Sequence, residues 1–94
     1  MCTIKQDTIN KVKGQVIAIV CNAFAGCETL EAIKEAKEIA TNRCLNGIKA
    51  MQAAEVFTAE EVELIANFST GYIACVEEKT RERVVEALRD AFEF

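Results

Sequence analysis

Phe57-Thr58-Ala59-Glu60-Glu61-Val62 is the stretch of the chain that most clearly predicts where a helix begins. Thr58 and Glu61 have the spacing of a capping box, in which the Thr58 hydroxyl accepts a hydrogen bond from the Glu61 N–H and the Glu61 carboxylate accepts one from the Thr58 N–H. Phe57 and Val62 stand at the two positions of a hydrophobic staple. We therefore predict that a helix starts at residue 58, and helical patterns continue from it in both directions.

Toward the C-terminus, apolar residues at helical spacing predict that this helix covers about residues 58–78. The mixed-sign cluster at residues 77–83 follows, where pairs such as Glu78 with Arg81 indicate an exposed turn or helix segment. The apolar stripe then resumes with Val84, Val85, Leu88 and Phe92. Thr80 either caps a fourth helix over about residues 80–92, or the third helix runs on to about residue 92.

Toward the N-terminus, two further helices are predicted over about residues 29–56 and 4–25. Thr29 or Glu28 opens the later one, whose apolar stripe crosses Asn46-Gly47 in register and so favours one helix, with a kink at Gly47 as the alternative. Gly26 is expected to end the first helix, because glycine adopts the left-handed conformation without a Cβ penalty.

The first helix has apolar residues on nearly all sides, from Val16 to Ala25. Such a helix is expected to be buried nearly all round, and a chain of 94 residues has few other helices to cover it, so we expect a homo-oligomer. The apolar run is shorter than the roughly 20 residues that span a bilayer, so no membrane association is expected.

Several function classes are excluded by what the chain lacks. It contains no histidine and no proline, so the commonest general base and zinc ligand are absent and no proline interrupts a helix. Its five cysteines are odd in number and show no CxxC spacing, which argues against a disulfide framework or zinc finger. Most of them lie in apolar helical patterns and are expected to be buried, in a protein of the cytoplasm. We expect no catalytic residue, no metal ion and no cofactor.

The negative charge of the chain is concentrated in its last third. The net charge is −4, and residues 57–94 carry nine acidic against four basic side chains. This distribution argues against direct binding of duplex nucleic acid and favours a basic protein partner. The predicted partner contacts are Glu60, Glu61, Glu63, Glu77, Glu78, Glu86 and Asp90.

Two alternative functions remain open. In the first, a homo-oligomer binds a small anion such as a nucleotide, and the predicted contacts are Tyr72, Lys79, Arg81 and Arg83. In the second, the chain is a small helical enzyme that uses carboxylates or the Cys75 thiol. The carboxylate row of Glu28, Glu31, Glu35 and Glu38 is interpreted as a solvated helix face, because Lys34 and Lys37 lie beside it.

The sequence as a whole therefore predicts an all-α fold, an antiparallel bundle or long hairpin of three to four helices that forms an oligomer. No motif places the chain in a family. The preferred function is that of a small acidic cytoplasmic protein without catalytic activity, which binds and modulates or inhibits a partner protein in the manner of immunity-type or phage-type inhibitors.

Overall fold

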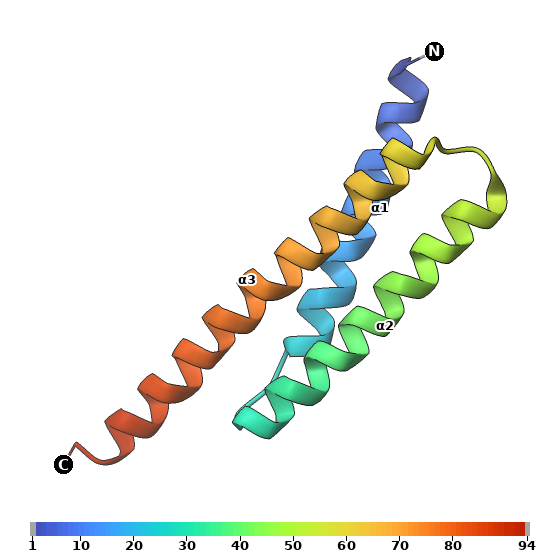
Figure 1. Cartoon of the computed structure of the whole chain (residues 1–94). Coiled ribbons are helices and arrows are strands. Elements are labelled where there is room, and N and C mark those ends of the chain that lie inside the picture. Colours follow the sequence, from blue (N-terminus) through green and yellow to red (C-terminus); the bar gives the residue numbers. More distant parts are fainter. Residues whose placement is uncertain (1, 94) are drawn as a thin grey trace.

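The computed structural model describes residues 2–93, and the side chains of residues 6–93. Three helices account for almost all of this part of the chain: α1 (Cys2–Phe24), α2 (Leu30–Ala54) and α3 (Ala59–Ala91). Each helix packs against the other two, with α2 antiparallel to both α1 and α3 (Figure 1). The all-helical prediction is confirmed for the described residues.

The starts of α2 and α3 are fixed by the predicted caps. At α3 the Glu61 N–H donates to the Thr58 hydroxyl at 3.1 Å, and the Thr58 N–H donates to the Glu61 carboxylate at 2.7 Å, which completes the capping box. At α2 the Ala32 N–H donates to the Thr29 hydroxyl at 3.0 Å. Side-chain oxygens therefore satisfy backbone donors that have no partner within the helix.

The two connections between helices use left-handed residues. Gly26, with φ of 74°, lies in the turn after α1, as the sequence predicts. Glu55, with φ of 57°, ends α2, and its N–H donates to the Gln52 carbonyl at 3.2 Å. A left-handed conformation costs a residue with a Cβ roughly 1–2 kcal/mol, so the α2–α3 connection carries local strain that the sequence did not indicate.

Both long helices are continuous where the sequence left alternatives. α2 passes through Gly47, and α3 passes through Thr80, so the separate fourth helix over residues 80–92 is not present. Instead of capping a new helix, the buried Thr80 hydroxyl donates to the Val76 carbonyl at 2.7 Å. The predicted pair of Glu78 with Arg81 is also replaced, because Arg81 contacts Glu77 one turn away at 3.4 Å.

The core consists of two apolar clusters along the length of the molecule. The larger cluster joins all three helices through residues such as Val20, Ile33 and Ile73. The smaller cluster lies nearer the α2–α3 connection and includes Val62 and Ile65, with Phe57 packed against it as the predicted staple requires. Each fully buried aliphatic side chain contributes about 1.5–3 kcal/mol, so these clusters hold the helices together.

A single copy leaves α1 partly uncovered, and the prediction that a homo-oligomer buries it on nearly all sides stays a prediction. Ile17, Ala18 and Cys21 are exposed, because α2 and α3 cover only one side of α1. The prediction that most cysteines are buried is only partly right. Cys27 and Cys44 are buried, Cys21 and Cys75 are exposed, and the side chain of Cys2 lies outside the described residues.

The third helix extends beyond the other two. It contains 33 residues, about 50 Å at 1.5 Å per residue, and its C-terminal end runs past the α1–α2 connection (Figure 1). Val84 is the last buried residue, and every residue from 85 to 93 is exposed. We call residues 85–93 the projecting end and the three helices up to Val84 the packed body. Across residues 2–93, none of the helices combines the length and the apolar character that crossing a membrane requires.

Candidate functional site

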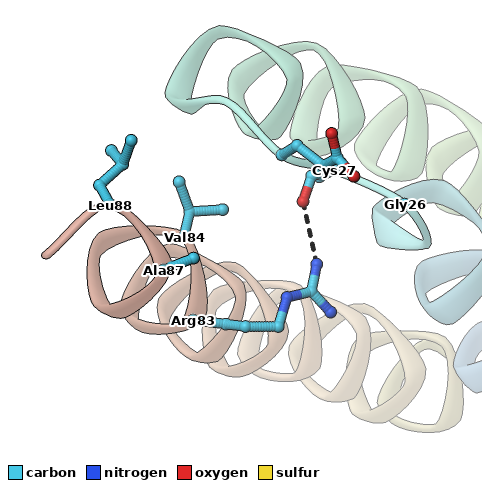
Figure 2. A pocket seen from close by; sticks show the side chains of 7 residues that line it. Gly26, Cys27, Arg83, Val84, Ala87 and Leu88 are labelled. Carbon is cyan, nitrogen blue, oxygen red and sulfur yellow. Dashed lines mark hydrogen bonds between the residues drawn. The ribbon is translucent and has the colours of Figure 1, made fainter. Parts of the chain in front are cut away.

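The projecting end leaves the packed body at a hydrogen bond between α3 and the α1–α2 connection. Arg83 donates from Nη2 to the Cys27 carbonyl at 3.0 Å, and this bond is drawn in Figure 2. The connection is further tied by the Cys27 N–H, which donates to the Phe24 carbonyl at 3.3 Å. A pocket of about 500 Å³ lies between the connection and α3, with Val84, Ala87 and Leu88 on the α3 side. The Arg83 hydrogen bond therefore ties the base of the projecting end to the α1–α2 connection.

One side of the projecting end is apolar and open to solvent. Val85 is 50%, Leu88 53% and Phe92 87% exposed. Their spacing of three and four residues puts them on one side of the helix. Exposed aliphatic and aromatic side chains grouped in this way are typical of surfaces that bind another protein.

The other side of the projecting end is acidic. Four acidic residues spaced four apart form a row along α3: Glu78, Glu82, Glu86 and Asp90. Within the projecting end, Glu86 and Asp90 lie on the side of the helix opposite Leu88. All four are exposed, and none of them makes an ion pair with another residue among 6–93. We call these four residues the acidic row. Unpaired carboxylates in a row attract a basic surface.

A shallow apolar groove runs between α2 and α3. It has a volume of about 420 Å³. Leu45 and Ile48 line it from α2, and the small residues Ala66, Thr70 and Ala74 line it from α3. We call it the α2–α3 groove. Leu45 is 45% exposed there, so this part of the packed body also presents apolar surface.

The seven predicted partner contacts do not form one surface. Glu60 and Glu63 are exposed at the start of α3, about 35–40 Å along the helix from Glu86. Glu61 is held in the capping box. Glu77, whose side chain is only 15% exposed, lies between Lys37 and Arg81 with ion pairs of 3.4 Å to each.

The remaining three predicted contacts, Glu78, Glu86 and Asp90, belong to the acidic row. Its fourth member, Glu82, was not among the predicted contacts, although the spacing of four residues was a signal for it. Val85, Leu88 and Phe92 were expected to continue the apolar stripe of the core. Their exposure could have been predicted only by comparing helix lengths. α3 has 33 residues and α2 has 25, so part of α3 is left uncovered.

The four residues of the anion-binding alternative have different surroundings. Arg81 faces α2 beside Glu77, Arg83 donates to the Cys27 carbonyl, and Tyr72 lies between α3 and α1. Lys79 is exposed. Since two of the three cations already have partners, the four side chains do not converge on a common point.

Tyr72 and Cys21 form the most developed polar contact between α1 and α3. The Tyr72 hydroxyl and Cys21 Sγ are 3.5 Å apart. The Tyr72 ring stacks on Phe68, with centroids 5.9 Å apart, and Lys13 lies over the Phe68 ring at 5.5 Å. The hydrogen bond to Cys21, together with burial, raises the pKa of Tyr72 above its ordinary value. The raised pKa favours the neutral form of the Tyr72 hydroxyl.

The thiols of the described residues lie in different environments. Burial raises the pKa of the Cys44 thiol, which opposes nucleophilic reactivity. Cys75 is exposed. Among residues 6–93, no three cysteine, aspartate or glutamate side chains are placed so that they could hold a metal ion together.

Comparisons with protein-family models, with curated proteins and with solved structures gave no match.

Proposed function

We propose that the chain is a non-catalytic protein that binds a partner protein and modulates its activity, and that the projecting end of α3 is the binding element. The observation that carries this proposal is the exposure of every residue from 85 to 93 on a helix that continues past the packed body. A helix with one apolar and one charged side is a common recognition element, since it lies in a groove or along a complementary surface of its partner.

The acidic row gives the partner its expected chemistry. Four unpaired carboxylates along one side of a helix favour a partner with clustered lysine and arginine side chains. Their attraction also increases the rate of encounter, and salt weakens it. Inhibition of the partner follows if the projecting end covers a site at which the partner acts.

The experiment is affinity capture from native lysate, followed by measurement of binding with the purified partner. Glu82→Lys, Glu86→Lys and Asp90→Lys together reverse the acidic row. The matched control reverses Glu31, Glu35 and Glu38, which form a comparable exposed acidic row on α2. We expect the first variant to weaken binding at least tenfold and the control to leave it within about twofold. Equal affinities for both variants would contradict the proposal.

A further inference from the structure

We propose that two copies of this chain associate through α3, antiparallel and with twofold symmetry, so that the projecting end of each copy fills the α2–α3 groove of the other. This inference rests on the proposed protein-binding role of the projecting end. It uses the apolar side of that end, whereas the acidic row remains free for a different partner.

The two surfaces lie on the same side of one helix. Ala66, Thr70 and Ala74 follow one another at four-residue spacing, as do Val84, Leu88 and Phe92 farther along. The first three line the α2–α3 groove, and Leu88 and Phe92 are exposed on the projecting end. One side of α3 therefore carries small residues in the packed body and large apolar residues beyond it.

The dimensions of the two surfaces agree. Ala66 to Ala74 and Val84 to Phe92 each span eight residues, about 12 Å of helix. Small residues on one helix allow the large side chains of another to approach closely and fill the space between them. The groove of about 420 Å³ has room for the Leu88 and Phe92 side chains of a second copy.

One antiparallel register joins all of these residues. When the twofold axis passes through residue 79, Phe92 of one copy lies level with Ala66 of the other, Leu88 with Thr70, and Val84 with Ala74. Every contact then occurs twice, as an isologous interface requires. Val84 is buried within its own copy, so Leu88 and Phe92 supply the exposed apolar side chains of this register.

Charges at the centre of this register are complementary. Glu77 of each copy lies level with Arg81 of the other copy. The two Glu77–Arg81 pairs lie on opposite sides of the twofold axis. Within one copy Glu77 is already 3.4 Å from both Arg81 and Lys37, so in the dimer two carboxylates lie among two guanidinium and two ammonium groups. Alternating charges fix the register, because a shift by one helical turn brings like charges together.

The shape of the molecule leaves room for this arrangement. The packed body covers α3 only as far as Val84. In the proposed register the two packed bodies therefore share only the levels of residues 74–84, and each projecting end extends beyond this shared part. Figure 1 shows this free length of α3 past the α1–α2 connection.

The apolar area that becomes covered is small for a protein interface. Phe92 is 87% exposed, and covering an aromatic side chain removes roughly 150–250 Å² from water. Leu88, Val85 and Leu45 are each about half exposed, and with them, counted from both copies, the total stays below the roughly 1,200 Å² at which standard interfaces begin. We therefore expect a weak, concentration-dependent dimer.

The test is sedimentation velocity of the full chain from about 1 to about 500 μM, a range in which weak dimers with micromolar to submillimolar dissociation constants form. We expect a concentration-dependent shift from monomer to dimer. Leu88→Asp with Phe92→Asp should leave the helical circular dichroism unchanged and remove the dimer, because both side chains are exposed in one copy.

A charge exchange tests the register itself. Glu77→Arg alone and Arg81→Glu alone each place like charges across the axis, so each should weaken the dimer roughly tenfold or more. In an equimolar mixture of the two variants, each pair across the axis again joins a guanidinium group to a carboxylate, so association should return to within about threefold of the original chain. Glu82→Arg and Arg89→Glu make the same charge changes on the outer side of α3 and should have little effect.

Three outcomes would overturn the inference. They are a monomer over the whole range, single charge variants that associate as the original chain does, and a mixture no stronger than its components. If the chain is a monomer and Leu88→Asp with Phe92→Asp weakens only a captured partner, the apolar side belongs to that partner, and the proposed function survives without the dimer. If the dimer forms and reversal of the acidic row leaves the captured partner unaffected, the proposed function fails alone.

Discussion

The two parts of α3 carry the same kind of apolar pattern and have different surroundings. In the packed body, residues such as Ile65 and Ile73 are almost fully buried by α1 and α2. In the projecting end, Leu88 and Phe92 follow at the same helical spacing and are exposed. Apolar periodicity therefore identifies which side of a helix packs against another surface. The lengths of the neighbouring helices decide whether that surface belongs to the same chain.

The largest expected effect separates the two parts by stability. Ile65→Ala removes a side chain that is 1% exposed and should lower the free energy of unfolding by about 2–5 kcal/mol, because it leaves a cavity. Leu88→Ala should change it by no more than about 0.5 kcal/mol, since little contact within one copy is lost. Urea unfolding followed by circular dichroism, at a concentration where the chain is monomeric, measures both. A comparable loss for Leu88→Ala would mean that the projecting end is packed.

The start of α3 offers a second contrast with its end. Thr58→Ala removes the capping oxygen and should lower the free energy of unfolding by about 1 kcal/mol, whereas Thr58→Ser keeps the oxygen and should cost much less. Truncation of the exposed Phe92 to alanine, at the other end, should have almost no effect on the monomer. Equal losses for the alanine and serine variants of Thr58 would show that the cap does not stabilise the packed body.

Arg83 marks the boundary between the two parts. Arg83→Ala removes the hydrogen bond to the Cys27 carbonyl and should lower the free energy of unfolding by about 0.5–1 kcal/mol. Arg89→Ala, six residues farther along in the projecting end, is the control, because the Arg89 side chain has no hydrogen bond or ion pair with residues 6–93. A loss of the same size for Arg89→Ala would contradict the assigned boundary.

The smallest effect concerns the α1–α3 contact in the packed body. The pKa of Tyr72 is raised in the folded state, so the neutral hydroxyl stabilises the fold below pH 10, and this contribution is lost as the pH rises through the folded-state pKa. Tyr72 is the only tyrosine and the chain has no tryptophan, so absorbance near 295 nm follows its titration directly. Cys21→Ala should move the midpoint down toward pH 10, and Cys75→Ala should move it less. An unchanged midpoint in Cys21→Ala would show that this hydrogen bond is absent.

The sequence predicted the local features well because caps and turns depend on neighbouring residues. Thr58 with Glu61, Thr29, and Gly26 all have the roles that their residue types and spacing indicate. The continuous path of α3 through Thr80 was one of two alternatives. It is decided by tertiary contact, since burial of Thr80 and Val84 against the other helices keeps the charged segment helical.

Features that depend on how the three helices cover one another were predicted less well. The split of the seven predicted partner contacts and the projecting end both follow from the relative lengths and positions of the three helices. A pattern in one helix does not contain that information. Leu88 and Ile65 look alike in the sequence, and only the position of the α1–α2 connection beside Val84 and Arg83 separates them.

Hydrogen–deuterium exchange of residues 85–92, measured at low and at high protein concentration, tests the central claim most directly. At low concentration these amides should exchange much faster than those of residues 62–84, because the projecting end has no packing partner. At high concentration they should become protected in the original chain and stay unprotected in Leu88→Asp with Phe92→Asp. Protection at low concentration equal to that of residues 62–84 would contradict the claim that α3 ends in a free binding surface.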